Sequence, residues 1–139
     1  MRYTRIMKLL AACLLLCTAL AVAAPPAASR TNSLTPCERA RIHALLDALE
    51  RSGLVFIRNG SEHTAPAARA HLEMKLDRAG GRITTAEQFI DRLASRSSAT
   101  GRPYTVRLDN GTEVQAGMWL RARLAEIDAR EKNPGKGMP

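Results

Sequence analysis

Aromatic residues are scarce in this chain of 139 residues, which has two phenylalanines, two tyrosines and one tryptophan. Proteins that bind single-stranded nucleic acid stack bases on aromatic rings and gather basic residues on one face. Here the few rings and the mixing of basic with acidic residues along the chain argue against a nucleic-acid partner. No apolar run after residue 22 approaches the roughly 20 residues that span a membrane, so no transmembrane segment is predicted.

Cysteine is also rare, and its positions exclude an internal disulfide in the expected mature protein. Two of the three cysteines, Cys13 and Cys17, lie in an apolar amino-terminal segment, which leaves Cys37 alone. In an oxidising compartment an unpaired cysteine is either buried or available to bridge two chains. The sequence places no histidine or acid to activate Cys37, so we expect this free thiol to be buried rather than reactive.

Motifs for metal binding and nucleophilic catalysis are missing. The chain contains no His-Glu-x-x-His or Cys-x-x-Cys sequence, the spacings typical of zinc sites. It also lacks the Gly-x-Ser-x-Gly elbow of the serine hydrolases. We therefore predict no metal and no cofactor, and the missing motifs favour a protein that is not an enzyme while leaving an enzyme open.

The amino terminus is organised as a cleavable signal peptide over residues 1–23. Basic residues up to Lys8 precede an apolar segment from Leu9 to Val22, and Ala21-Val22-Ala23 is the small-x-small pattern that signal peptidase accepts. Leu10-Ala11-Ala12-Cys13 also matches a lipoprotein box, but only four apolar residues separate Lys8 from Cys13, fewer than the roughly seven that an export signal needs. We therefore expect a periplasmic or secreted protein cut after Ala23.

Cleavage changes the charge and size of the chain. It removes 23 of 139 residues, three of the 21 basic ones and none of the 13 acidic ones, which leaves 116 residues with a net charge of 18 − 13 = +5. That length fits one domain. The positive charge is typical of a surface that simply aids solubility, and the alternative is that it attracts an anionic partner.

The remaining chain predicts one globular domain over residues 35–130. A lead-in at 24–34 is rich in Ala, Pro and Ser, and a disordered tail is expected at 131–139. Helices are predicted at about 36–52, 65–79, from 85 onward, and 117–130. The first shows the spacing i, i+3, i+4, i+7 of a buried helix face, and both Thr35–Glu38 and Thr84–Glu87 have the spacing of a capping box.

Two hairpin signals separate these helices. Asn59-Gly60 is typical of a two-residue turn, and Asp109-Asn110-Gly111 marks a second turn. The fragments Asn59-Gly60-Ser61-Glu62 and Asn110-Gly111-Thr112-Glu113 match at an offset of 51 residues, which suggests an internal α-ββ-α repeat. We predict an α+β fold in which four helices pack on two β-hairpins that can pair into one four-stranded antiparallel sheet.

Three cationic side chains of the second predicted helix share one face. His71, Lys75 and Arg78 stand at i, i+4 and i+7, and together with Arg58 at the first turn they can bind an anionic group. The alternative is that their stems cover the edge of the core while the charged ends stay in water.

Further ligand-binding candidates follow the third helix. Loops on a rigid scaffold often carry binding residues, and this loop holds Ser97 and Ser98 and is followed by Tyr104. The alternative is that its serine hydroxyls cap the helix end and the turn while Tyr104 anchors the loop. Trp119 in the last helix is expected at the boundary of the core and completes the candidate set.

Several segments are similar to a known family. Phe56-Ile57-Arg58-Asn59-Gly60, Thr85-Ala86-Glu87-x-Phe89-Ile90 and Ser95-Arg96-Ser97-Ser98 with the later Pro103-Tyr104 resemble small secreted proteins of Gram-negative bacteria that are catalogued only as a domain of unknown function. The resemblance covers about residues 38–127 and implies a periplasmic location without an activity. It also implies that an apolar contact of Leu54 with Leu108 replaces a disulfide found in other members.

Three functions remain open at this point. The leading prediction is a non-enzymatic module, a monomer or weak dimer, that binds an envelope protein or an anionic envelope component. The alternative is a small periplasmic hydrolase or transferase using His71, Lys75, Glu87 and the loop 95–98, which requires these groups to converge in a pocket. The third is a structural helper in a larger assembly, with Cys37 or an apolar patch at an interface.

Overall fold

The protein is described by a computed structural model over residues 33–133, so the predicted signal peptide lies outside the described residues. The elements follow the order α1 (Pro36–Arg51), β1 (Val55–Arg58), β2 (Ser61–His63), α2 (Ala65–Ala79), η1 (Gly80–Arg82), α3 (Ala86–Phe89), η2 (Ile90–Ala94), β3 (Thr105–Arg107), β4 (Glu113–Gln115) and α4 (Ala116–Lys132). The predicted α+β class is confirmed, and the order α-β-β-α occurs twice. None of the described helices is long and apolar enough to cross a membrane.

The first helix begins at the predicted cap. The Thr35 hydroxyl accepts a hydrogen bond from the Glu38 N–H at 3.2 Å, which satisfies one of the free amide groups of the first turn. The capping box is not completed in the predicted way, because the Glu38 carboxylate bonds Arg41 and accepts from the Ala86 N–H at 2.7 Å. Glu38 therefore joins α1 to the start of α3 instead of closing its own helix.

The third helix begins one residue later than predicted. Its cap is Thr85, whose hydroxyl accepts from the Gln88 N–H at 3.1 Å, while the Gln88 side chain accepts from Thr84. This register buries Phe89 completely. After one turn α3 continues as the π-helical segment η2.

The last helix extends two residues beyond the predicted end, to Lys132. It stops at Asn133, whose N–H donates to the Arg130 carbonyl at 3.2 Å. Asn133 precedes Pro134, and the residue before a proline is disfavoured in helical conformation.

The two hairpins close differently although both contain Asn-Gly. Asn59 and Gly60 both have positive φ, 53° and 85°, as a two-residue type I′ turn requires. In the second hairpin the Leu108 N–H donates to the Thr112 carbonyl at 2.9 Å and only Gly111 has positive φ, at 81°, which is a three-residue loop. The sequence match at a constant offset therefore does not extend to the turn geometry.

The hairpins form one antiparallel sheet in the order β2-β1-β3-β4. In the central pair Phe56 faces Val106, and both side chains are buried toward the helices. Val55 faces Arg107 at the end of this pairing, and Leu54 and Leu108 follow at the next position, where the family resemblance predicts an apolar contact.

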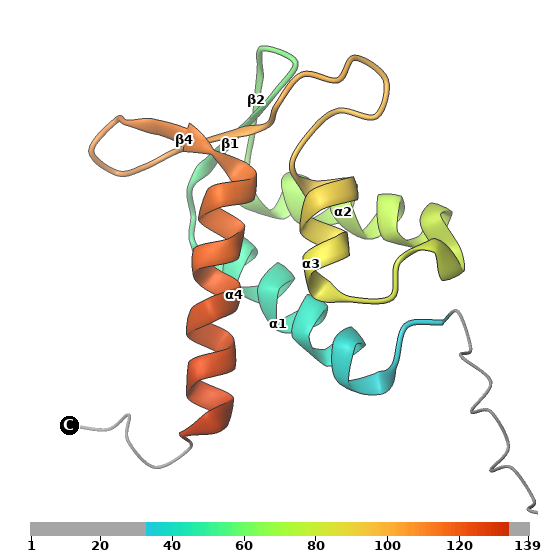
Figure 1. Ribbon diagram of the computed structural model, residues 1–139. Coiled ribbons are helices and arrows are strands. Elements are labelled where there is room, and N and C mark those ends of the chain that lie inside the picture. The colour runs from blue at the N-terminus through green and yellow to red at the C-terminus, as the bar shows by residue number, and fades with distance from the viewer. Residues whose placement is uncertain (1–32, 134–139) are drawn as a thin grey trace, which may run out of the picture. The chain divides into compact units, whose positions relative to one another are not determined.

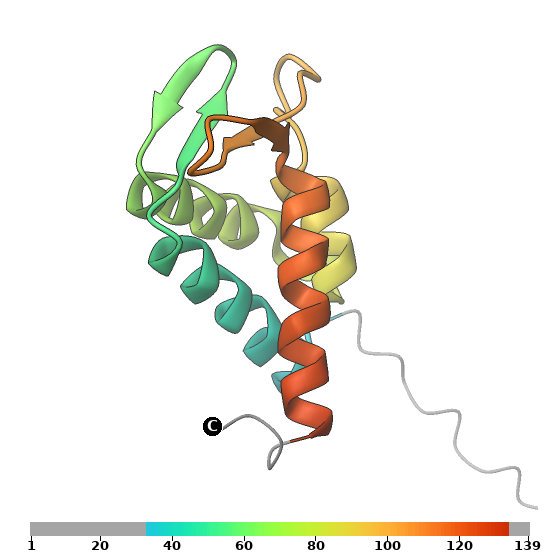
Figure 2. The ribbon, with the colours of Figure 1, turned by 90° about the vertical axis from the view of Figure 1, so that its left-hand side faces the viewer.

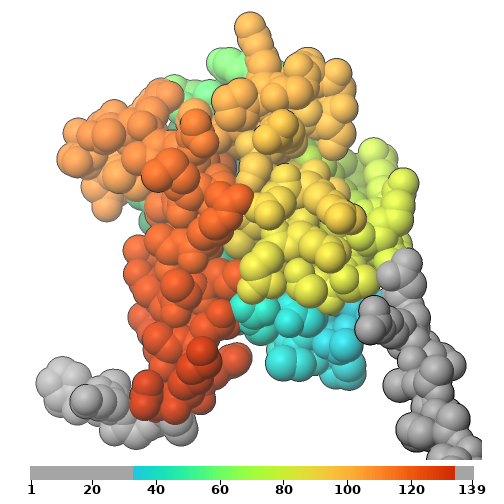
Figure 3. Space-filling view, viewed as in Figure 1, coloured from blue at the N-terminus to red at the C-terminus, as the bar shows by residue number. Residues whose placement is uncertain are grey.

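The sheet lies across one end of the helices. Figures 1 and 2 show α2 beneath the β1–β2 hairpin, while α1 and α4 run away from the sheet. The space-filling view shows α4 packed along the α3 segment, with the loop 95–103 rising above it (Figure 3). The core between these elements contains the predicted α1 stripe, Ile42, Leu45, Leu46 and Leu49, all at most 1% exposed.

Two arginines, Arg41 and Arg69, each form ion pairs with three carboxylates. Arg41 of α1 pairs with Glu38 at 3.0 Å, Glu87 at 2.7 Å and Asp128 at 2.7 Å, so it joins α1 to α3 and α4. Arg69 of α2 forms a second cluster with Asp47, Glu50 and Glu73 at 2.6–2.9 Å. Much of the acidic charge of the domain is thereby neutralised away from the candidate ligand-binding residues.

Candidate ligand-binding site

A hollow of about 660 Å³ lies between α2, the β1–β2 turn and the loop 95–103. Seven of the eight ligand-binding candidates line it: Arg58, His71, Lys75, Arg78, Ser97, Ser98 and Tyr104. Arg82 adds a further cation, and no aspartate or glutamate is among the lining residues. We call this feature the basic hollow. The structure therefore brings together side chains from the three segments that the sequence marked separately.

Lys75 holds the loop in place. Its ammonium group donates to the carbonyls of Leu93 and, at 3.1 Å, Arg96, and it lies 5.1 Å from the centre of the Tyr104 ring. Burial and the nearby charge of Arg58 lower the pKa of Lys75. The sequence offered two interpretations of Lys75, an anion-binding group or a stem with its charged end in water. The structure fits neither, because the amine is hydrogen-bonded to the loop backbone.

The serines divide into two structural groups. The Ser95 hydroxyl donates to the Ile90 carbonyl at 2.7 Å, and the buried Ser97 hydroxyl accepts from the Thr100 N–H at 3.3 Å and from the Asn59 side chain at 3.5 Å. These contacts close the end of η2 and tie the loop to the β1–β2 turn, as the capping alternative predicts. Ser98 is exposed beside the hollow.

Arg58 stands at the centre of the positive charge. It is the last residue of β1, and the charge of its guanidinium acts to lower the pKa of His71, Lys75 and Tyr104, although burial raises that of Tyr104 overall. Within residues 33–133, neither Arg58 nor Arg78 forms an ion pair. The basic hollow therefore holds positive charge that no carboxylate of the described chain compensates.

His71 is the neutral member of this group. Burial is the main cause that lowers its pKa, and the charges of Arg58, Lys75, His63 and Arg78 lower it further. Because an ordinary histidine titrates near pH 6.5, His71 is an uncharged imidazole at neutral pH. At that pH it adds no positive charge to the basic hollow.

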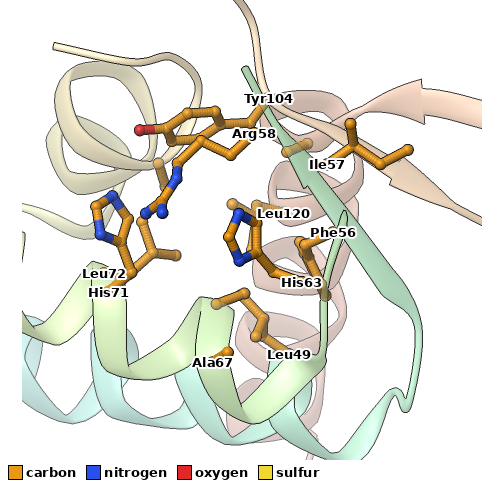
Figure 4. A pocket seen from close by; sticks show the side chains of 13 residues that line it. Leu49, Phe56, Ile57, Arg58, His63, Ala67, His71, Leu72, Tyr104 and Leu120 are labelled. Atoms are coloured by element: carbon orange, nitrogen blue, oxygen red, sulfur yellow. The ribbon is translucent and has the colours of Figure 1, made fainter. Parts of the chain in front are cut away.

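A second cavity adjoins the hollow. This apolar pocket, of about 270 Å³, shares Arg58, His71 and Tyr104 with the basic hollow and is otherwise lined mainly by Phe56, Leu49, Leu72, Leu120 and small alanine side chains. Figure 4 shows the Arg58 guanidinium between the imidazoles of His71 and His63. The buried Nε2 atoms of both histidines have no hydrogen-bond partner among the described residues.

His63 is the site residue that sequence reasoning missed, since it was assigned only to the end of a hairpin. A two-residue turn pairs Arg58 with Ser61 and therefore Phe56 with His63. Facing residues of paired strands lie on the same side of a sheet, so His63 shares the inward face with Phe56. The two-residue turn at Asn59-Gly60 was therefore enough to place His63 on the inward face of the sheet.

Trp119 lies apart from the other candidates. Its ring meets Phe56 edge-on with centres 5.8 Å apart, and the Arg123 guanidinium lies 5.6 Å from its centre. Trp119 lines neither cavity. It supports the wall of the apolar pocket from behind Phe56 rather than offering a surface to a ligand in either cavity.

Cys37 is exposed, so the expectation that it is buried is wrong. At 100° per residue, Cys37 projects roughly 130° away from the middle of the α1 core stripe. The helical position, rather than the apolar character of the thiol, decides its exposure.

The catalytic grouping of His71, Lys75 and Glu87 is not assembled. Glu87 accepts from Arg41 at 2.7 Å in the α1–α3–α4 cluster and lines neither cavity. Arg41 is the main cause that lowers the pKa of Glu87, so this carboxylate is held as an ion-pair partner. With Lys75 and Ser97 committed to the loop, the described residues of the hollow present no nucleophile paired with a base.

Comparison with known proteins identifies relatives but no activity. Residues 36–128 match the model of a family described as "Family of unknown function (DUF5329)". A Salmonella typhimurium (strain LT2) protein named "Uncharacterized protein YfeK" is 53% identical over 68 residues, which are 48% of this chain and 57% of the relative. The match thus spans little more than half of that relative. No solved structure was found to match the chain.

Proposed function

The chain belongs to the family of unknown function DUF5329, and we propose that it is a non-enzymatic module that binds an anionic component of the bacterial envelope in its basic hollow. One observation carries the proposal: the hollow gathers Arg58, Arg78 and Arg82 and contains no acidic side chain. A low-dielectric concave wall concentrates the field of such charges and attracts anions.

The geometry supports binding more than catalysis. Lys75 donates to the Leu93 and Arg96 carbonyls, and the Ser97 hydroxyl accepts from the Thr100 N–H, so the wall of the hollow is preorganised. Preorganisation reduces the entropy lost on binding. An arginine that is free of ion pairs, as Arg58 is within the described chain, matches carboxylate or phosphate oxygens with two parallel N–H donors.

Export is the second part of the proposal and rests on the organisation of residues 1–23. Cells that express the full-length chain are expected to yield a periplasmic or secreted form whose amino-terminal residue is Ala24. Fractionation followed by amino-terminal sequencing measures this directly. A stable, uncut precursor in the cytosol would remove the envelope from the proposed function.

Anion binding is tested by titrating the ¹⁵N-labelled exported protein with sodium acetate and with inorganic phosphate at constant ionic strength. Saturable amide shifts are expected near residues 58–60, 71–78 and 97–104. Losing the charge-assisted bonds of Arg58 in Arg58→Gln should weaken binding roughly 10- to 100-fold. Arg51→Gln removes the same charge from an exposed position outside the hollow and should leave binding unchanged.

The two variants together decide the proposal. Equal weakening in Arg58→Gln and Arg51→Gln means that only net charge matters, and the hollow is then no specific site. An unchanged titration of Arg58→Gln contradicts the proposal outright. If amide shifts appear only with acidic polypeptides such as polyglutamate, the partner is an acidic protein. That outcome also overturns the assignment to a small envelope anion.

A further inference from the structure

We infer that the ligand is a single-chain alkyl carboxylate of medium length, with its hydrocarbon chain in the apolar pocket and its carboxylate at Arg58. The inference rests on the proposed anion-binding function and deepens it. Its basis is that the two cavities share Arg58, His71 and Tyr104. A ligand that occupies both must carry an apolar part next to a negatively charged part.

The apolar pocket has the lining that a hydrocarbon requires. Leu49, Leu72 and Leu120 form its floor and sides together with Phe56. Four further lining positions are alanines, whose small side chains leave space: Ala67 and Ala68 on α2, Ala94 on η2 and Ala116 on α4. Removing apolar ligand surface from water into such a lining is the main source of affinity for a hydrocarbon chain.

The volume limits the chain length. A cavity of about 150 Å³ lined by apolar side chains holds one benzene molecule. By that scale the 270 Å³ pocket accepts a chain of roughly ten carbons. Shorter chains leave part of the pocket empty, and the methylenes of longer chains remain in solvent.

The mouth of the pocket matches one negative charge. Among the residues that line the apolar pocket, Arg58 is the permanent cation, and His71 is neutral at pH 7. The unpartnered Nε2 atoms of His63 and His71 are buried beside it, and an unsatisfied buried polar atom is unfavourable. A carboxylate satisfies an arginine in bidentate geometry and accepts further N–H donors from imidazole rings. A monoanionic head group therefore fits better than a dianionic phosphate.

Trp119 provides the signal for a direct test. It is the single tryptophan of the chain and contacts Phe56, which lines the apolar pocket. The full exported protein is titrated, below micelle-forming concentrations, with acetate, hexanoate, octanoate and decanoate. Since each buried methylene contributes a nearly constant increment, affinity should rise about fourfold per added methylene up to the ten carbons of decanoate.

Two matched substitutions on α2 locate the chain. Ala67→Phe places a ring in the apolar pocket and should remove most of the gain in affinity from acetate to decanoate. Ala67 and Ala70 are both exposed on the same helix, but Ala70 lines neither cavity, so Ala70→Phe should retain that gain. Thermal melts test whether both variants fold. If Ala67→Phe does not fold, the chain-length series on the unchanged protein still decides the inference.

The outcomes separate this inference from the proposed function. If acetate and phosphate bind through Arg58 but decanoate binds no more tightly, the hydrocarbon assignment is wrong and the anion site stands. If decanoate binds with the chain-length dependence but Arg58→Gln leaves its affinity unchanged, both the carboxylate contact and the proposed function fail. Decyl phosphate or decanol binding as tightly as decanoate overturns the choice of a carboxylate.

Discussion

Replacing Arg41 by methionine should destabilise the domain far more than the same change at Arg69. Both arginines contact three carboxylates, but their surroundings differ. The Arg41 side chain is 14% exposed and its partners Glu38 and Asp128 are 21% and 29% exposed, with Glu87 at 57%. The Arg69 side chain is 23% exposed and all of its partners are at least 41% exposed.

The expected free energies follow from this difference. Removing one partner of a buried ion pair costs about 3–5 kcal/mol, and the exposure of Glu87 places Arg41→Met near the lower end, at about 3 kcal/mol. Exposed pairs contribute about 0.2–1 kcal/mol each, so Arg69→Met should cost about 1 kcal/mol. For a domain of this size each kcal/mol shifts the melting temperature by roughly 4–8 °C.

The pH dependence of the Arg41 effect has a definite sign. Arg41 is the main cause that lowers the pKa values of Glu87 and Asp128. Groups with a lowered pKa stabilise the folded state above their ordinary values, near pH 4, and this stabilisation is lost as the pH falls through the folded-state values. The difference between the unchanged protein and Arg41→Met should therefore be complete at pH 7 and shrink below about pH 4.

Urea unfolding followed by circular dichroism, at pH 7 and at intervals down to pH 3, measures both quantities. Arg69→Met is the matched control, because it also removes one arginine from a three-carboxylate cluster. An equal or larger loss of stability in Arg69→Met refutes the argument from burial. A loss in Arg41→Met that stays constant down to pH 3 refutes the electrostatic part.

Three further outcomes concern the turn, a helix contact and a histidine. Gly60→Ala should cost about 1 kcal/mol or more in thermal unfolding, because Gly60 has a φ of 85° that a Cβ disfavours; an unchanged melting temperature contradicts the turn assignment. Gly117→Ala should lower the free energy of unfolding by about 1–3 kcal/mol, since the new Cβ stands 3.2 Å from the Ser95 Cβ and closer still to its hydroxyl. Adding Ser95→Ala should recover part of this loss of stability. Because burial lowers the pKa of His71, the unfolded chain takes up a proton before the folded chain, and stability should fall as the pH drops below about 6.5. In urea unfolding, His71→Gln should reduce this dependence of stability on pH. An unaltered dependence would show that His71 is not its source.

Features that depend on short stretches of chain were accessible from the sequence. The stripe from Ile42 to Leu49 predicts the buried face of α1, because a helix repeats every 3.6 residues whatever surrounds it. Asn59-Gly60 predicts its turn, because few residue pairs tolerate two consecutive positive φ angles. The shared face of His71, Lys75 and Arg78 follows from the same helical repeat, and these residues do line one hollow.

Features that depend on which distant segments meet were decided by the tertiary structure. Thr84 and Thr85 are equivalent as helix caps in the sequence. In the structure the helix is capped by Thr85, and Phe89 is packed into the core. Glu87 has the spacing of a capping partner, yet Arg41, 46 residues away, binds it.

The candidate site shows the same division between local and distant information. The sequence itself determined the helices, the hairpins and the residues that share a helical face, because these are set by backbone preferences and periodicity within a few residues. Only the fold decided that Lys75 secures the loop and that His63 and His71 line the same apolar cavity. Those arrangements join segments from separate parts of the chain, and their energies appear only once the core brings the segments together.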